Sequence, residues 1–242
     1  MEKILVLIIV SISFHVVSFA QATTPQSATT AKVISIGEQV QASVVHIVTT
    51  YEPISIGGDS VEVGTSYSTG SVYAVLDGKT YISLPRHSID ESLSGRRVAS
   101  MKIYFSNWAM FEPDTWTCKN FTGGDIDAAF IVIDKIVVGV TPIQSLITTK
   151  LPTKGDPLTL YCSKEMRGPI FETKHSTYSY YDPRIVSSNM KMKEGWGLEG
   201  GNSGGVVCSE EGVVGITHCK ETDDAQNAFY IPVSIYEELF KQ

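Results

Sequence analysis

The sequence predicts an all-β protein, an antiparallel barrel or sandwich with a short helix near each end. Short runs rich in β-branched and aromatic residues recur along the chain, separated by Gly, Asp and Pro turns, and helical segments do not alternate with them. The chain has 242 residues, 43% hydrophobic and 19% charged, which is enough apolar material for a sizeable core.

The N-terminal segment predicts an export signal. MEK precedes an apolar run, ILVLIIVSISFHVVSF, and small residues follow it. Ser18 and Ala20 fit the −3 and −1 positions of a cleavage site after Ala20, and Ala22 offers a second one. A membrane anchor is the alternative, but the run is short and contains Ser and His. We expect residues 1–20 to be a cleaved signal peptide and the mature protein to be secreted or periplasmic, without membrane contact.

The mature chain begins with a polar segment. Residues 21–32, QATTPQSATTAK, have low complexity and no periodicity, which predicts a flexible linker. Ser35 and Glu38 then form a capping-box pattern that predicts a short helix over 35–44. The expected strands are 43–51, 64–76, 79–84, 100–106, 128–133, 157–162, 212–217 and 227–233.

Local turn signals mark two hairpins and a final helix. Asp77-Gly78 stands between apolar runs, a strong hairpin signal. The stretch VVCSEEGVVGITHC predicts a second hairpin that turns at SEEG. Ser234 and Glu237 make another capping box, which predicts a terminal helix with Ile235, Leu239 and Phe240 available for one face.

The net charge is −7, which argues against a nucleic-acid partner because such surfaces normally carry basic patches. Export makes the four cysteines candidates for disulfides, and four cysteines allow three connectivities. One pairing is excluded. The predicted hairpin sets Cys208 opposite about Val213, too far from Cys219 for a bridge.

The stretch GLEGGNSGGVV places five glycines around Ser203. A nucleophilic serine needs unobstructed neighbours and backbone N–H groups that point at the oxyanion formed on attack. The backbone of Gly201, Asn202 and Ser203 supplies an oxyanion hole of this kind, with the N–H groups of Gly201 and Ser203 able to converge. The plain alternative is a glycine-rich turn that carries an exposed serine.

Serine also needs a histidine as base. His87 directly follows the apolar strand TYISL, which suits a side chain that projects into a cleft. His15 leaves with the signal, His46 stands mid-strand, and His175 lies in a polar stretch where a solvated loop residue is expected. An ordinary loop histidine is the alternative for His87 taken alone.

The histidine in turn needs a buried carboxylate that orients it. Asp127 stands immediately before the apolar strand AAFIVI, where burial and a fixed position are expected. Asp125 lies two residues back in a glycine-rich turn and fits a turn residue better. We therefore favour Asp127 over Asp125.

These residues, in the order His, Asp and Ser, resemble the chymotrypsin-like serine proteases. The closer match is the HtrA-type (high-temperature-requirement) branch. SIGEQVQASVVHIVTT is similar to the opening helix and strand of that family, and STGSVYAV is similar to its GSGF segment. EGVVGIT is similar to the strand after the serine, and AFYIPVSIYEELF is similar to the closing strand and helix. The resemblance covers residues 33–241 and implies a protease domain over 33–242, built as two six-stranded antiparallel β-barrels with the active site between them. No segment for a PDZ domain follows, so we expect none.

The resemblance implies that His87 is the general base, Asp127 its orienting carboxylate and Ser203 the nucleophile, with the oxyanion hole at Gly201 and Ser203. Two positions depart from the family pattern: Pro85 and Arg86 precede the histidine, and Val206 replaces the proline after SGG. An IVGG-like activation site is not visible, so we do not expect trypsin-type zymogen activation.

The resemblance also places the pocket for the residue before the scissile bond. Its implied lining residues are Gly197, Leu198, Ile216, Thr217 and His218. An Asp of the trypsin type is missing, so small or aliphatic residues are the expected preference. A preference for Glu or Gln, of the glutamyl endopeptidase type, is the alternative. In that family a histidine on this strand recognises the acidic side chain, but counting along the strand puts this position at Thr217, so that His218 points the other way.

A similarity of SGGVVC to the trypsin stretch SGGPVVC, with one residue deleted, implies a Cys162–Cys208 disulfide. Together these features predict a secreted serine endopeptidase that acts on polypeptides through an acyl-enzyme, without cofactor or metal. An inactive binding protein with the protease fold is the second hypothesis. The oligomeric state is left open by the sequence.

Overall fold

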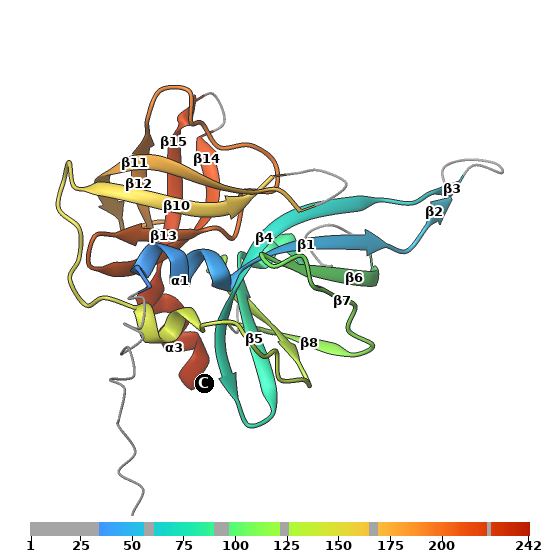
Figure 1. The fold of residues 1–242 in the computed structure, drawn as a ribbon. Helices are drawn as coiled ribbons and strands as arrows, with labels where there is room; N and C mark the ends of the chain where they lie inside the picture. Colours follow the sequence, from blue (N-terminus) through green and yellow to red (C-terminus); the bar gives the residue numbers. More distant parts are fainter. Residues whose placement is uncertain (1–33, 56–60, 90–96, 122–125, 165–168, 222–223) are drawn as a thin grey trace, which may run out of the picture. The chain divides into compact units, whose positions relative to one another are not determined.

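Two antiparallel sheets make up the fold, and each is built from strands that follow one another along the chain (Figure 1). The computed structural model describes residues 34–55, 61–89, 97–121, 126–164, 169–221 and 224–242. For residues 54–55, 61–62, 219–221 and 225 it describes the backbone alone. The predicted signal peptide, the linker and Asp125 therefore lie outside the described residues.

The N-terminal sheet has seven strands in the order β7-β6-β1-β4-β5-β9-β8. Its strands are β1 (Val44–Tyr51), β4 (Thr65–Leu76), β5 (Lys79–Leu84), β6 (Val98–Phe105), β7 (Met110–Phe111), β8 (Trp116–Asn120) and β9 (Ala129–Ile133), and β2 (Ile54–Ser55) pairs with β3 (Val61–Glu62) apart from it. We expected a six-stranded antiparallel barrel here. The seven strands form a half-barrel, in which the described residues make no ladder between the outer strands β7 and β8.

The C-terminal sheet is a closed barrel in the order β10-β11-β12-β15-β14-β13. It consists of β10 (Pro157–Ser163), β11 (Phe171–Asp182), β12 (Ser187–Met192), β13 (Val206–Ser209), β14 (Gly212–Glu221) and β15 (Asp224–Pro232). This confirms the six-stranded barrel expected for this half. The polar segment around His175, expected to be a loop, is strand β11, in which the buried Lys174 and Ser176 alternate with the exposed His175 and Thr177.

Both predicted hairpins form. β4 and β5 pair through Leu76 and Lys79, and Asp77 and Gly78 between them both have positive φ, 51° and 80°, as a type I′ turn requires. β13 and β14 pair with Cys208 opposite Val213, as expected.

Short helical elements pack against the junction of the two sheets (Figure 1). Helix α1 (Ile36–Ser43) has the predicted capping box of Ser35 and Glu38. Helix α3 (Val233–Lys241) follows Pro232 and has no side-chain cap, so the predicted capping by Ser234 is wrong. The helix begins two residues earlier than this cap predicts, which puts Ser234 inside its first turn. The 3₁₀ turns are η1 (Arg86–Ser88) and η2 (Ile143–Leu146).

The apolar core has three parts. One fills the N-terminal sheet, one fills the barrel, and one joins the two sheets to α1, η2 and α3. Tyr236 of α3 is fully buried in the joining cluster and donates a hydrogen bond to the carbonyl oxygen of Leu84 (3.0 Å). Among the described residues, none of the helices has the length and hydrophobicity needed to cross a membrane.

The predicted Cys162–Cys208 disulfide is wrong, because both residues are buried thiols. Cys208 pairs with Thr159 across β10 and β13, so it lies three residues from Cys162 along the strand, roughly 10 Å. An odd separation also turns the two side chains to opposite faces of the sheet, and each belongs to a different core cluster.

Candidate active site

His87 and Asp127 come together because neighbouring strands lead to them. β5 pairs with β9, and Leu84 stands opposite Ala129 at the end of this ladder. The pairing continues past the strands, since the Arg86 N–H donates to the carbonyl oxygen of Asp127 (3.2 Å). The turn η1 then carries His87 alongside Asp127, two residues before β9.

The Asp127 carboxylate binds His87 twice. Oδ1 accepts the backbone N–H of His87 at 2.8 Å, and Oδ2 contacts its ring Nδ1 at 2.7 Å. An ionised carboxylate can only accept hydrogen bonds, so the ring proton lies on Nδ1 and Nε2 is left as the acceptor. The side chain of His87 is 42% exposed and that of Asp127 is 28% exposed. The sequence-based choice of Asp127 is consistent with this contact.

A second imidazole reaches the same carboxylate. His218 on β14 contacts Asp127 Oδ2 through its Nδ1 at 3.2 Å, and its side chain is only 13% exposed. Burial raises the pKa of Asp127, but the hydrogen bonds from His218 and His87 outweigh burial and hold this pKa well below its usual range. Asp127 is therefore a carboxylate throughout the pH range in which histidines change charge.

Ser203 stands in the turn between Leu198 and β13. Gly201 and Gly204 on either side of it have φ of 87° and 95°, which side chains rarely adopt. Among the described residues, the Ser203 hydroxyl donates to the carbonyl oxygen of His218 (3.1 Å), and a hydrogen bond to His87 does not form. A chain of contacts nevertheless links the three predicted residues, since His218 touches Ser203 through its backbone and Asp127 through its ring.

The predicted oxyanion donors divide into two groups. Within the described part of the chain, the N–H groups of Gly201 and Ser203 have no hydrogen-bond partner. The N–H of Asn202 donates to the carbonyl oxygen of Glu199 (3.2 Å), so Asn202 is not available as a donor. Its fully buried side chain accepts from the N–H of Glu199 (2.8 Å) and donates to the carbonyl oxygen of Ser163 (2.7 Å).

Thr69 of β4 ties this turn to the N-terminal sheet. Its hydroxyl donates to the carbonyl oxygen of Gly201 (2.6 Å), and its N–H donates to the carbonyl oxygen of Ser203 (2.8 Å). A Cβ on Gly204 would overlap the carbonyl oxygen of Thr69 and would touch the ring of Pro85. Glycine is thus required at 204 for close approach as well as for its φ, and the turn abuts the residues that lead to His87.

A buried polar chain stands behind Thr69. Ser163 Oγ lies 2.9 Å from Thr69 Oγ1 and 3.0 Å from Nδ1 of His46, and all three residues are fully buried. The hydroxyl of Thr69 already donates to Gly201, so it accepts from Ser163, which in turn accepts from His46. His46 is therefore a core histidine that supports the turn from the N-terminal sheet.

A buried charge cluster holds the turn from the barrel side. Lys174 Nζ donates to the carbonyl oxygen of Gly197 (2.8 Å) and lies 3.2 Å from Glu172 Oε1, which also accepts from Asn202 (3.0 Å). The Lys174 side chain is 4% exposed. Burial raises the pKa of Glu172, but Lys164 and Lys174 outweigh burial and lower it overall. Lys174 is thus a paired buried cation.

The five predicted pocket residues have different environments. Ile216 and Thr217 are fully buried, Leu198 is 6% exposed, and Gly197 bonds Lys174 through its carbonyl oxygen. The Thr217 hydroxyl contacts the carbonyl oxygens of Asn202 (2.9 Å) and Gly205 (3.1 Å), so Thr217 supports the turn rather than lining a pocket. The ring of His218 contacts the carboxylate of Asp127.

Reasoning from the sequence missed the residues that fix the turn, namely Thr69, Ser163, Glu172 and Lys174. The available signal was weak. Lys174 occupies an inward position in the alternation of β11, but this segment had been interpreted as a loop because its other side chains are polar.

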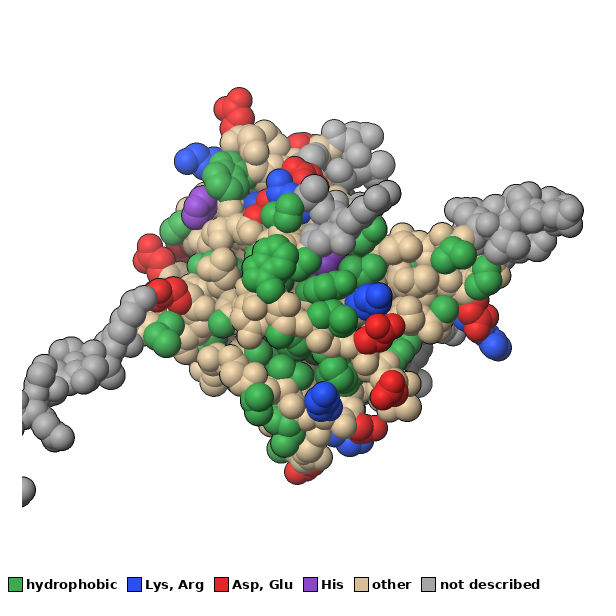
Figure 2. Space-filling model, turned by 45° about the vertical axis from the view of Figure 1, so that its right-hand side comes forward, with side chains coloured by type: hydrophobic (Ala, Val, Ile, Leu, Met, Phe, Trp, Pro, Cys, Tyr) green, Lys and Arg blue, Asp and Glu red, His purple; other side chains and the backbone are tan. Residues whose placement is uncertain are grey.

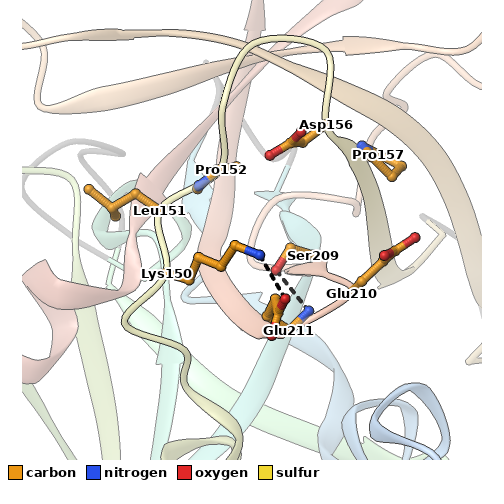
Figure 3. Close-up of a pocket in the computed structure, with 8 residues that line it drawn as sticks. All are labelled: Lys150, Leu151, Pro152, Asp156, Pro157, Ser209, Glu210 and Glu211. Carbon is orange, nitrogen blue, oxygen red and sulfur yellow. Dashed lines mark hydrogen bonds and ion pairs between the residues drawn. The ribbon is translucent and has the colours of Figure 1, made fainter.

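Two other surface features lie outside this site. A hollow of about 120 Å³ lies between segment 150–157 and turn 209–211, where Lys150 Nζ contacts Glu211 Oε1 at 2.7 Å (Figure 3). None of His87, Asp127 and Ser203 lines this hollow.

On the face shown in Figure 2, the described Lys and Arg side chains stand near Asp and Glu and gather in no continuous basic patch. Among the described residues, no group of three or more His, Cys, Asp or Glu residues is arranged to hold a metal ion.

Comparison with known proteins identifies the fold. No family model and no curated protein matches the chain. Among solved structures, the serine endoprotease from Yersinia pestis has a TM-score of 0.60 at 17% identity, over 87% of this chain and 68% of that one. The Rv3671c protease from M. tuberculosis, active form, has 0.60 at 14% identity, over 85% and 82%. The HtrA-type protease AlgW with a tripeptide has 0.63 at 12% identity, over 85% and 61%. The chain thus has the fold of HtrA-type and trypsin-fold serine proteases.

Proposed function

We propose that this protein is a serine endopeptidase in which Ser203 is the nucleophile, His87 the general base and acid, and Asp127 the orienting carboxylate. The observation that carries the proposal is the double contact of Asp127 with His87, which fixes the ring proton on Nδ1 and presents Nε2 as a base. The two unbonded N–H groups beside Ser203 add the second requirement of acyl transfer.

The proposed reaction has two stages. Ser203 Oγ attacks the carbonyl carbon of the scissile peptide while His87 Nε2 takes the hydroxyl proton, and the oxyanion is stabilised by the N–H groups of Gly201 and Ser203. Nε2 then gives this proton to the leaving amine as the C–N bond breaks, which leaves an acyl-enzyme. Water attacks the ester with Nε2 again as base, and the acid product and free Ser203 are released.

The direction of the Ser203 hydroxyl favours one alternative. Because it bonds the His218 carbonyl oxygen rather than His87, attack requires rotation of the Ser203 hydroxyl away from this partner and toward His87. A protein in which this rotation never occurs would be a binding module with the protease fold.

Labelling with a fluorophosphonate probe tests the proposal. The mature chain should label at Ser203, Ser203→Ala should not label, and His87→Ala should label at least roughly 10⁴-fold more slowly. Ser145→Ala is the matched control, because Ser145 is exposed and bonds only its own turn. A folded parent that does not label at any pH favours the binding-module alternative.

We further propose a preference for small or aliphatic residues before the scissile bond. The alternative is a preference for Glu or Gln, whose side-chain oxygens would need a hydrogen-bond donor that has no other partner. Both ring nitrogens of His218 already have partners, and the charge of Lys174 is neutralised by Glu172. Cleavage of a peptide library by the purified protein tests the preference. Predominant cleavage after Glu or Gln would refute it.

Export is also proposed, on the basis of the N-terminal sequence alone. N-terminal sequencing of protein recovered outside the cytoplasm should give a start at Gln21 or at Thr23. Recovery of the protein with Met1 in the cytoplasm would refute export.

A further inference from the structure

His218 occupies a position from which it can act on Asp127 rather than on the substrate. The ladder between β14 and β15 shifts register here: Thr217 pairs with Tyr230 and Cys219 with Phe229, so His218 has no residue of its own opposite. Such a bulge re-aims a side chain. The ring thereby reaches out of the barrel to the carboxylate that the N-terminal sheet presents.

Both nitrogens of the ring are engaged. Nδ1 lies 3.2 Å from Asp127 Oδ2, and Nε2 lies 2.8 Å from the hydroxyl oxygen of Ser187 on β12. Since a carboxylate only accepts hydrogen bonds, Nδ1 of His218 is protonated and donates a hydrogen bond to Asp127. His218 is therefore the second N–H donor to the oxygen that already binds His87.

Ser187 allows the ring to exist in two charge states. Its hydroxyl lies 2.8 Å from His218 Nε2 and 3.1 Å from the carbonyl oxygen of Ile185. When His218 is neutral, the Ser187 hydroxyl donates to Nε2. When His218 takes up a proton, Nε2–H donates to Ser187, which then donates to Ile185. Both ring nitrogens of His218 keep a partner in both states, and only the exposed Ile185 carbonyl oxygen gains or loses the Ser187 donor, so protonation requires no rearrangement of the fold.

We propose that His218 is an ionisable positioning residue: when neutral it holds Asp127 in place for His87, and when protonated it weakens the site at acid pH. This inference rests on the proposed function. An imidazolium at His218 would partly neutralise the charge of Asp127, which then would stabilise less well the imidazolium that forms on His87 during acyl transfer.

The other titratable groups beside this pair are few. Of the described residues, His87 on η1 contacts Asp127 directly, Tyr236 on α3 faces Asp127, and Tyr230 stands opposite Thr217 on β15. Burial raises the pKa of both tyrosines, so they stay neutral over the range in which histidine changes charge.

Two substitutions separate donation from ionisation. His218→Asn retains an N–H at a position close to Nδ1 but cannot ionise, whereas His218→Leu has neither property. We would measure the second-order rate of fluorophosphonate labelling of the mature chain between pH 5 and 8. His175→Asn is the matched control, because His175 is an exposed histidine of β11 that contacts Trp196.

At pH 8, His218→Leu should label roughly 10- to 100-fold more slowly than the parent, the rate equivalent of one hydrogen bond to a charged group. His218→Asn should label within about threefold of the parent. On acidification the parent should lose rate with the uptake of two protons, and His218→Asn with the uptake of one. The proposal would be overturned if His218→Leu labelled as fast as the parent at pH 8. It would also be overturned if the labelling rate of His218→Asn fell with decreasing pH in the same way as that of the parent.

A spectroscopic readout keeps the inference separate from catalysis. Proton NMR of the parent should give two low-field imidazole N–H signals, one of which is absent in His218→Leu and both of which are absent in Asp127→Asn. If the parent does not label, the proposed function fails, and these signals still decide whether His218 donates to Asp127. A single low-field signal that persists in His218→Leu would overturn the inference.

Discussion

His87 and Asp127 are held by the ladder between two neighbouring strands, whereas Ser203 is held by a turn whose anchors come from β4, β10, β11 and β14. In the first case, backbone hydrogen bonds shared by every residue type set the geometry. In the second, particular buried side chains set it. Changes in the supporting side chains should therefore cost less folding stability in the acid–base half than in the nucleophile half.

The largest expected effect is in the nucleophile half. Gly204→Ala should destabilise the protein by about 4 kcal/mol or more and abolish labelling, because the new Cβ overlaps the carbonyl oxygen of Thr69. Gly155 is a matched control with nearly the same φ, 94° against 95°, and a Cβ added there would meet nothing within 4 Å. Gly155→Ala should cost only about 1 kcal/mol. Urea unfolding of both variants measures the difference, and equal costs would contradict the close approach.

The buried charge cluster is the next test of the same half. Lys174→Met should cost about 3–5 kcal/mol and slow labelling, because Glu172 is left without its buried partner and Gly197 loses its donor. Lys164→Met removes a partly exposed cation from the same carboxylate and should cost less than about 1 kcal/mol. Urea unfolding tests both variants. Indistinguishable costs would mean that Lys174 is not an anchor.

In the acid–base half, pH is the sharper probe. The folded pKa of Asp127 is depressed below its unfolded value, so its contribution to stability is present above about pH 4 and is lost as pH falls below that. The parent should therefore lose about 1–2 kcal/mol more than Asp127→Asn between pH 5 and pH 2.5. Urea unfolding at several pH values measures this. Parallel pH curves for the two proteins would contradict the depressed pKa.

The smallest effect concerns the cysteines of the barrel. Burial raises the pKa of the Cys208 thiol to about 12 and that of Cys162 still further, so neither should react with alkylating reagents until the protein unfolds. Mass spectrometry after alkylation, with and without urea, checks this. A Cys162–Cys208 bridge in the native protein would show that the register of β10 and β13 differs from the one described.

Much of this architecture was predictable because it depends on local patterns. Asp77-Gly78 predicted its hairpin, since the two residues tolerate positive φ, and Ser35 with Glu38 predicted the start of α1. The strand that ends before His87 and the strand that begins after Asp127 were both recognised from their composition, and pairing them required only that they be neighbours.

Other features depend on pairing between distant strands. The Cys162–Cys208 disulfide was wrong because one residue of register moves a side chain to the other face of a sheet. The polar β11 was missed because its inward residues, Lys174 and Ser176, are polar too, so the alternation carried no apolar signal.

The sequence by itself determined the all-β class, the two hairpins, the helix at each end, and the residues His87, Asp127 and Ser203 as candidates, because these follow from local conformational preference and side-chain chemistry. Only the tertiary structure decided what surrounds them: that Thr69, Lys174 and Asn202 hold the turn, and that His218 meets Asp127. Such contacts join residues far apart in the chain. A polar side chain gives no local sign of its buried partner, since that partner is fixed by strand register and by a bulge.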